Sequence, residues 1–391
     1  MFKGVIRSIT PATLAYFASF ITLGLFASIL GPTLLGLAEN TNTRLSEIGI
    51  LFTARSLGYM FGSLRGGKAF DRFSGHYLLA TVLIFLGCVV VIVPLIHRLW
   101  LLASLLFLLG IGEAGLDVGV NLMMVWAHRG RAGPFLNALH FFFGIGAFLS
   151  PIIVAQVLIM SGNITGAFWS LTFFAFPIAL WLLRIKSPDL HQNNHDYNDD
   201  QQNLFLVLLI STLFVLYVGA EVSFGGWIFT YTVSLGLGDS TTAAYMTSAF
   251  WGALTVGRLL GIPLSGRVSP RKILLIDLMG CLFCLPIVLF IPNSYLAIWV
   301  GTIGLGLFMA SFYPTVLAFA EKRIVLSGRI TRWFFFASGI GQMILPWLFG
   351  ILFETTSPQW AMRAIMIDLL LALVLFVVGI SMLKDVQIDY S

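Results

Sequence analysis

Long uninterrupted apolar runs constrain this chain more than any other feature of its sequence. A bilayer core of about 30 Å is crossed by roughly 20 apolar residues in a helix. The chain contains twelve runs of that kind: 12–37, 46–66, 77–96, 99–127, 132–160, 165–185, 203–234, 240–264, 271–291, 295–320, 331–352 and 359–383. Since a spanning segment must satisfy its backbone polar groups internally, we predict an all-α membrane protein with twelve transmembrane helices.

The composition excludes several other protein classes. Of 391 residues, 58% are apolar and only 10% are charged, against about 25% charged in a typical soluble domain. A soluble protein of this length could not hide so much apolar surface, which excludes a secreted enzyme, a cytosolic dinucleotide-binding enzyme and a nucleic-acid binder. The first run is too long for the apolar part of a signal peptide, so we expect it to remain as a transmembrane helix.

The polar segments indicate how the chain is divided and oriented. The one long polar loop, Lys186 to Asn203, separates six runs from six. We predict an N-terminal bundle (1–185), a cytoplasmic linker (186–202) and a C-terminal bundle (203–391). With both termini inside, 17 of the 22 Lys and Arg residues are cytoplasmic and 3 are outside, as the positive-inside rule requires. We therefore expect a multi-pass protein of the plasma or inner membrane, its positive charge facing lipid head groups and not nucleic acid.

The two halves share short sequence patterns at similar offsets. Three segments of the first half reappear six helices later: Gly144–Pro151 as Gly339–Pro346, Gly110–Gly112 as Gly304–Gly306, and Arg55–Gly58 as Arg258–Gly261. Each match pairs helix n with helix n + 6. Repeated halves with a substrate site between them are common in transporters, so we predict two pseudo-symmetric six-helix bundles.

Ionisable residues within the fourth span suggest a coupling-ion site. Glu113, Asp117 and Asn121 follow one another at intervals of four residues, which places them on one face of a helix. Two carboxylates one turn apart repel each other, so at least one is expected to hold a proton or share a cation. Either the acids bind a coupling cation, or each is paired separately or lies near a helix end.

The seventh span contains a second acid, Glu221, which we also assign to cation coupling. Gly225 and Gly226 follow it, and we expect them to break the helix and expose backbone groups to a cavity. Trp227 then offers a flat apolar face on which a sugar ring can stack, or lies in the interfacial belt. Trp251 is a similar substrate-binding candidate, with core packing as its alternative.

Other polar residues within the spans have two readings each. Arg55 and Arg258 occupy matching motif positions in the two halves and could pair with intramembrane acids, in a gating or structural role. Asn137, His140 and Gln342 could bind substrate or form hydrogen bonds between helices. A repeat offset of 194 aligns Asp117 with Ser311, which suggests that only one half supplies a coupling acid at this position.

The loop after the second span resembles the signature of the major facilitator superfamily. Gly67-Lys-Ala-Phe-Asp71-Arg72-Phe-Ser-Gly75 is similar to its G-x-x-x-D-R-x-G motif, with one extra residue before the last Gly. The resemblance covers nearly the whole chain and implies the twelve-helix major facilitator fold. It also implies that Asp71 and Arg72 pin cytoplasmic helix ends during gating.

Within that superfamily the chain is similar to the fucose–galactose–hexose symporters, most of all to their sodium-dependent glucose transporter-like branch. Four segments contribute to this resemblance: Asp117–Asn121, Asn137–Gly144, Tyr217–Trp227 and Ser311–Thr315. It implies that Asp117 is an essential protonatable group and that Asn137 and His140 line the sugar site. His140 replaces the Gln of that family, and the first span lacks the family's second acid, for which Glu113 or Glu221 could substitute.

The resemblance implies a symporter that moves a hexose-like sugar with Na⁺ or H⁺ by alternating access. It implies no cofactor, and we expect a monomer in the bilayer. An exporter of an amphipathic drug or lipid-like solute is the alternative with the same fold. A membrane enzyme or sensor is disfavoured because no catalytic motif is present, and the lone Cys281-x-x-Cys284 pair is expected to be core packing.

Overall fold

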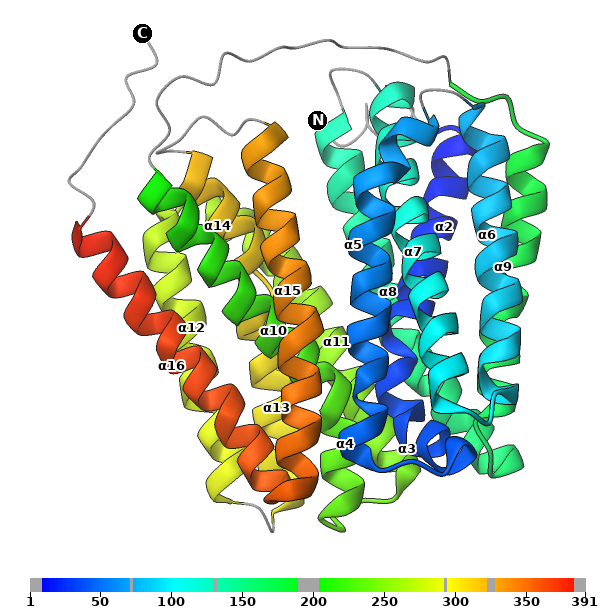
Figure 1. Ribbon diagram of the computed structural model, residues 1–391. Helices are drawn as coiled ribbons and strands as arrows, with labels where there is room; N and C mark the ends of the chain where they lie inside the picture. The colour runs from blue at the N-terminus through cyan, green and yellow to red at the C-terminus, as the bar shows by residue number, and fades with distance from the viewer. Residues whose placement is uncertain are drawn as a thin grey trace, which may run out of the picture. The chain divides into compact units, whose positions relative to one another are not determined.

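In the computed structural model, residues 9–70, 73–128, 132–188, 204–291, 294–321 and 328–382 are described. These residues are almost entirely helical (Figure 1). Two compact units are present: Met1–Arg44, Ala54–Asn194 and Ser240–Ser248 form unit 1, and Leu45–Thr53, His195–Asp239 and Ala249–Ser391 form unit 2. The predicted linker lies outside the described residues from residue 189 onward.

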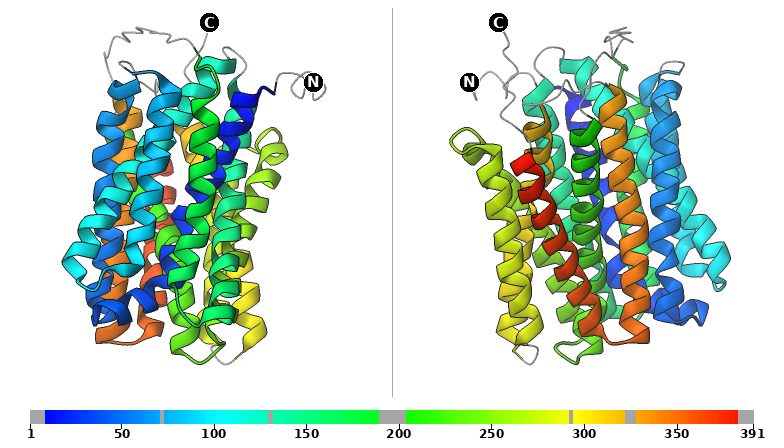
Figure 2. Two further views of the ribbon diagram at one scale, coloured as in Figure 1. Left: turned by 90° about the vertical axis from the view of Figure 1, so that its right-hand side faces the viewer. Right: turned by 60° about the vertical axis from the view of Figure 1, so that its left-hand side comes forward.

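Most of the first half of the chain belongs to unit 1. Its helices are α2 (Pro11–Ser28), α3 (Leu30–Thr41), α5 (Ile50–Phe70, after its first turn), α6 (Gly75–Ile92), η1 (Val93–Leu95), α7 (Leu99–His128), α8 (Ala132–Ser161) and α9 (Thr165–Leu183). Helix α2 packs along α8, and α6 packs along α9 (Figure 2, left).

Unit 2 contains most of the second half of the chain. Its helices are α4 (Leu45–Ile48), α10 (Leu204–Ser234), α11 (Ser240–Ser265, after its first nine residues), α12 (Pro270–Phe290), α13 (Tyr295–Met309), α14 (Phe312–Glu321), α15 (Gly328–Thr355) and α16 (Pro358–Met382). Helix α10 packs along α15 as α2 does along α8, and α16 contacts both α10 and α12 (Figure 2, right).

Within the described residues, ten helical segments are long and apolar enough to cross a membrane. They match ten of the twelve predicted spans. The second and eighth spans correspond to α5 and α11, which are 21 and 26 residues long but less apolar, because α5 contains Arg55 and α11 contains Arg258 and several Ser and Thr residues. Long apolar helices therefore confirm a multi-pass membrane protein, while twelve spans are not confirmed by apolar length.

Prolines interrupt two of the predicted spans. The first is divided into α2 and α3 at Ile29, just before Pro32, and the tenth into α13 and α14, just before Pro314. Because proline has no N–H, the carbonyl four residues earlier loses its helical hydrogen bond. The helices are interrupted at both places, whereas Pro151 and Pro346 lie within unbroken helices.

Glycines allow the closest helix pairs in both units. A Cβ atom on Gly146 of α8 would lie 2.0 Å from the Ile21 carbonyl of α2, and one on Gly341 of α15 would lie 2.1 Å from the Val215 carbonyl of α10. Gly146 and Gly341 are also matched by the sequence repeat. The repeat therefore has a structural basis, since both halves pack their first and fifth helices through backbone contact.

Arg55 and Arg258 match in sequence, but they do not occupy equivalent positions relative to the glycines that pack their helices. Gly58 faces the Phe107 backbone and Gly257 faces the Leu307 backbone, so Gly257 is the packing counterpart of Gly58. Arg55 precedes its glycine by three residues, whereas Arg258 follows its own by one. The arginines are displaced by about one helical turn, which corrects the prediction that they occupy equivalent positions.

Candidate functional site

A buried ion pair connects α5 and α7 in unit 1. The guanidinium of Arg55 donates hydrogen bonds to both carboxylate oxygens of Glu113, with an Nε–Oε2 distance of 2.8 Å and an Nη2–Oε1 distance of 2.7 Å. It also donates to the backbone oxygen of Ala27, at 2.9 Å. The Glu113 side chain is 4% exposed. Two parallel bonds of this kind are the strongest form of carboxylate pairing, so the charge of Glu113 is balanced within the protein.

Asp117 lies one turn further along α7 and has a different environment. Its Oδ2 atom accepts a hydrogen bond from the hydroxyl of Tyr59, and its Oδ1 atom accepts one of 2.8 Å from the Asn121 amide. The His140 side chain interacts with it electrostatically. No basic side chain in the described residues forms an ion pair with Asp117. The chain therefore separates its two α7 acids, one matched by an arginine and one held by neutral donors with a histidine nearby.

This arrangement tests the prediction that Glu113, Asp117 and Asn121 share one face of α7. Asp117 and Asn121 contact each other, as their spacing indicates. Glu113 instead pairs with Arg55 of α5. Such separate pairing of the acids is the alternative to a shared cation that the sequence left open. Its predicted role in cation coupling therefore has no geometric support in this conformation, whereas that of Asp117 does.

The two predicted sugar-binding residues of α8, Asn137 and His140, are exposed. His140 packs edge-on against Phe20 of α2, with ring centroids 5.9 Å apart, and Asn137 lies one turn earlier on the same helix. Both are on the predicted cytoplasmic half of α8. The electrostatic interaction between His140 and Asp117 links the predicted sugar and cation residues of unit 1.

In unit 2, Glu221 and Arg258 form a looser pair. The Arg258 Nη2 atom lies 3.9 Å from Glu221 Oε1, and the two side chains are 28% and 12% exposed. The pair satisfies the expectation that each arginine could meet an intramembrane acid. Arg258 lies about one helical turn away from the position that matches Arg55. It pairs with Glu221 on α10, whereas Arg55 pairs with an acid on α7.

The predicted helix break after Glu221 is wrong. Helix α10 runs without interruption from Leu204 to Ser234. Gly225 and Gly226 make room for large neighbours instead: a Cβ atom on Gly225 would lie 2.8 Å from the Trp251 ring, and one on Gly226 would lie 2.8 Å from the Phe52 ring. The two glycines allow close packing and expose no backbone groups.

Trp227 is enclosed within unit 2 and presents no open face. It is 1% exposed, packs against Phe52 and Phe353, and donates its indole N–H to the Pro346 carbonyl at 3.0 Å. A ring in this position stabilises the interior of the unit. Stacking of Trp227 on a sugar therefore has no support in this conformation, and the residue is not in an interfacial belt either.

Trp251 has an unused hydrogen-bond donor. It is partly exposed, and its indole N–H is buried without a partner in the described residues. Most buried donors in folded proteins are satisfied, so an orphan beside the Gly225 face of α10 is a candidate ligand contact. Gln342 on α15 is also partly exposed, and its predicted role stays a prediction.

Sequence reasoning missed several groups that the structure brings to these clusters. Tyr59 lies one turn after Arg55 on α5, a spacing that could have indicated that both face α7. Asp277, which has no pattern in the sequence, accepts a hydrogen bond of 2.7 Å from Ser311. Ser311, the residue aligned with Asp117, therefore contacts an acid from another helix, and the prediction that only one half supplies the coupling acid at this position stays a prediction.

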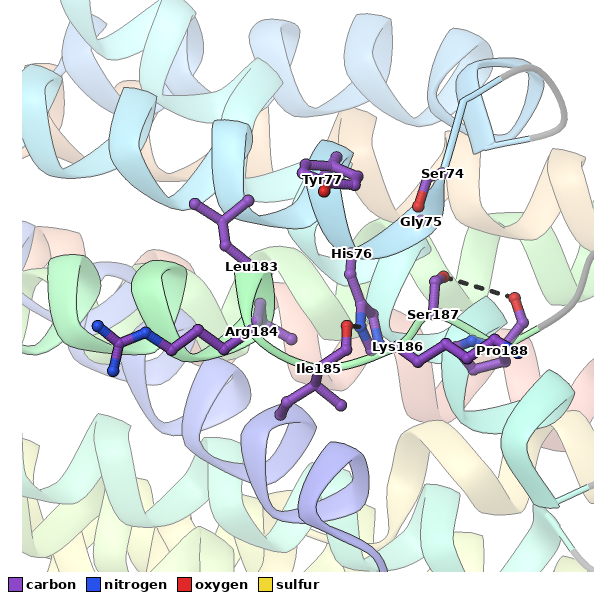
Figure 3. Close-up of a pocket in the computed structure, with 11 residues that line it drawn as sticks. Ser74, Gly75, His76, Tyr77, Leu183, Arg184, Ile185, Lys186, Ser187 and Pro188 are labelled. Atoms are coloured by element: carbon purple, nitrogen blue, oxygen red, sulfur yellow. Dashed lines mark hydrogen bonds between the residues drawn. The ribbon is translucent and has the colours of Figure 1, made fainter.

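The gating residues Asp71 and Arg72 lie outside the described residues. A cavity of about 530 Å³ is present in unit 1, between the first turn of α6 and the segment after α9 (Figure 3). There His76 bridges the Tyr16 hydroxyl, at 2.7 Å, and the Ile185 carbonyl, at 2.9 Å. Both ring nitrogens are occupied, so His76 fastens three segments together, and the cavity contains none of the predicted site residues.

Comparisons with known proteins place the chain in a family. A family model for the Major Facilitator Superfamily matches residues 13–346. Sodium-dependent glucose transporter 1 of Xenopus laevis is 29% identical over 356 residues, which cover 83% of this chain and 72% of the relative. The protein of the same name from Danio rerio is 30% identical over 379 residues, or 87% of this chain and 64% of the relative.

Solved structures share the fold at low sequence identity. A nucleoside transporter superposes with a TM-score of 0.78 at 13% identity, over 96% of this chain and 100% of that one. A D-xylose–proton symporter superposes with a TM-score of 0.74 at 12% identity, over 95% and 97%. The chain is a multi-pass membrane transporter that belongs to the Major Facilitator Superfamily and, within it, is similar to the sodium-dependent glucose transporter 1 proteins.

Proposed function

We propose that this protein is a symporter that carries a hexose-like sugar together with Na⁺ or H⁺. One observation carries the cation part of the proposal: of the two acids on α7, Glu113 is neutralised by Arg55, while Asp117 has only neutral donors and His140 around it. A charge that is unmatched inside a membrane protein is costly. A cation that binds Asp117 removes this cost and permits the conformational change.

The sugar part of the proposal rests on relatives and on chemistry. The curated relatives named above are described as sodium-dependent glucose transporters. Sugars need several hydrogen-bonding groups and an apolar face. Asn137, His140 and Gln342 supply polar atoms, and Trp251 supplies both a ring and an unused N–H. Within unit 1, Asn121 donates a hydrogen bond to the Asp117 carboxylate, so this proposed substrate contact also responds to cation binding.

In the proposed transport cycle, the unpaired charge of Asp117 controls when the protein can change conformation. A cation on Asp117 would lower the cost of enclosing the acid, and the two bundles would then exchange access between the two membrane sides. The arginine pairs in each unit would hold their helices together during this movement. We further propose that both termini are cytoplasmic, on the basis of the positive-inside distribution, and that the protein acts as a monomer.

Uptake into proteoliposomes tests this proposal. A panel of labelled hexoses is offered under a Na⁺ gradient alone, a H⁺ gradient alone and no gradient. We expect concentrative uptake of at least one hexose under one of the cation gradients. Uptake that no cation gradient drives would contradict coupling. Thermal stabilisation by amphipathic drugs but by no hexose would favour the exporter instead.

A further inference from the structure

A second polar cluster lies in the interior of unit 2. Asp277 on α12 is 5% exposed, and the hydroxyl of Ser311 donates a hydrogen bond of 2.7 Å to its Oδ2 atom. Tyr217 and Cys281 interact electrostatically with the Asp277 carboxyl. No basic side chain in the described part of the chain forms an ion pair with it.

The charge balance of this cluster repeats that of unit 1. In unit 1 one arginine matches one glutamate, and Asp117 is left with a hydroxyl donor. In unit 2, Arg258 lies 3.9 Å from Glu221, and Asp277 is left with the hydroxyl of Ser311. Among the described residues, no basic side chain forms an ion pair with Asp117 in unit 1, or with Asp277 and Asp368 in unit 2, and of those two acids in unit 2 Asp277 has a hydroxyl donor as Asp117 does.

The surroundings of Asp277 suit a proton and not a metal cation. Hard cations such as Na⁺ and Ca²⁺ bind several oxygen ligands, whereas the groups near Asp277 are one serine hydroxyl, one tyrosine and the thiol of Cys281, a soft ligand. No cluster of three or more His, Cys, Asp or Glu side chains that could hold a metal occurs in the described residues. A proton needs a single carboxylate oxygen, and it removes the cost of an ionised acid within a span.

We propose that Asp277 is a second proton-accepting group of this transporter, and that it takes up and releases one proton in each transport cycle. The proton binds Oδ1 from the aqueous phase while Oδ2 keeps its hydrogen bond from Ser311, and the same proton leaves when the cycle returns. The coupling to transport rests on the function proposed above, whereas the binding of a proton by Asp277 does not.

The elements around α12 contain other groups that could titrate. They are Tyr217 and Glu221 of α10, Arg258 of α11, Cys281 and Cys284 of α12 itself, Tyr295 of α13, Tyr313 and Glu321 of α14, and Arg363 and Asp368 of α16. Among these, Glu221 is paired with Arg258, and Asp368 has a buried carboxylate oxygen with no hydrogen-bond partner in the described residues. A test must therefore distinguish Asp277 from Asp368 in particular.

Infrared difference spectroscopy of the purified protein in lipid, without any sugar, tests whether Asp277 binds a proton. Wild type, Asp277→Asn and Asp368→Asn are each titrated over the pH range in which they remain folded. We expect a protonated-carboxyl band that disappears on raising the pH, is absent from Asp277→Asn and remains in Asp368→Asn. Ser311→Ala retains the acid and is expected to shift the frequency of that band, because the hydrogen bond is lost.

Sugar accumulation at steady state tests the coupling. When n cations move with each sugar, the accumulation ratio equals the cation gradient raised to the power n. If Asp117 also carries a proton, a tenfold H⁺ gradient supports about 100-fold accumulation in wild type and about tenfold in Asp277→Asn. If Asp117 carries Na⁺, Asp277→Asn loses the contribution of the H⁺ gradient and keeps that of the Na⁺ gradient.

Two results would overturn the inference. A full set of protonated-carboxyl bands in Asp277→Asn, unchanged in Ser311→Ala, means that Asp277 never holds a proton. Equal accumulation ratios in wild type and Asp277→Asn mean that it does not take part in coupling. If wild type accumulates no sugar at all, the proposed sugar symport is wrong, and the infrared titration still decides whether Asp277 binds a proton.

Discussion

Arg55 holds Glu113 by two parallel hydrogen bonds of 2.8 and 2.7 Å across the interface of α5 and α7. The same arginine donates to the carbonyl of Ala27 at the end of α2, so one guanidinium joins three helices of unit 1. The pair also determines which α7 acid is available. Because Glu113 is matched, Asp117 is the acid on that helix that can change its charge state at low cost.

Breaking the Arg55–Glu113 pair on one side is expected to destabilise the protein strongly. Glu113→Gln leaves a buried guanidinium without its counter-charge, a situation that costs about 3–5 kcal/mol. The double variant Arg55→Met, Glu113→Leu removes both charges and should unfold at a higher temperature than either single variant. Thermal unfolding in lipid nanodiscs measures this, and a double variant less stable than both singles would contradict a paired structural role.

Removing the hydroxyl of Tyr59 should change cation binding without unfolding the protein. The hydroxyl competes with a cation for the Asp117 carboxylate, and a hydrogen bond to a charged group contributes about 1.5–3 kcal/mol. Tyr59→Phe is therefore expected to lower the half-saturating concentration of the coupling cation by roughly tenfold or more. Tyr77→Phe, at a residue 64% exposed, is the matched control and should leave it unchanged. An unaltered cation dependence in Tyr59→Phe would show that Asp117 does not bind the cation.

The glycine contacts between first and fifth helices predict equal sensitivity in the two halves. Gly146→Ala and Gly341→Ala each place a methyl group against a neighbouring backbone, and overpacking of this kind costs roughly 1–3 kcal/mol. Gly133→Ala, on the same helix as Gly146, meets no atom within 4 Å and should be neutral or slightly stabilising. Melting temperatures of the three variants check this, and a tolerant Gly341→Ala would argue against equivalent packing.

The two tryptophans should separate structure from substrate binding. Trp227→Phe loses a satisfied buried hydrogen bond and is expected to lower the unfolding temperature, with the KM of the surviving protein for sugar unchanged. Trp251→Phe loses no satisfied hydrogen bond, because its indole N–H has no partner in the described residues. It should keep its stability and raise the KM by roughly tenfold, the effect of about 1.4 kcal/mol. A raised KM in Trp227→Phe with a lowered unfolding temperature in Trp251→Phe would instead assign Trp227 to substrate binding and Trp251 to structure.

The helical architecture could be predicted from the sequence because it depends on local properties such as apolar length and residue spacing. Apolar length locates the helices. The spacing of Asp117 and Asn121 predicts their contact because helical periodicity alone brings them together. These features require no knowledge of which helices are neighbours.

Pairings between helices could not be predicted, because membrane helices are apolar on all sides and their rotation is not encoded in hydropathy. The sequence could not tell whether Arg55 meets Glu113 or Asp117, one turn apart on α7. Trp227 was expected at an open face because its helix was expected to break, whereas the glycines beside it allow packing. Asp277 and Ser311 lie on different helices with no shared motif, so only the fold brings them together.

Replacement of Asp117 by asparagine tests the central claim most directly. Gradient-driven hexose uptake and sugar exchange at equal concentrations are measured in the same proteoliposomes, with Glu321→Gln, an exposed carboxylate at the end of α14, as the control. We predict that Asp117→Asn loses concentrative uptake and retains exchange, because a neutral side chain mimics the cation-bound acid, while the control keeps both. Wild-type accumulation by Asp117→Asn would contradict the account.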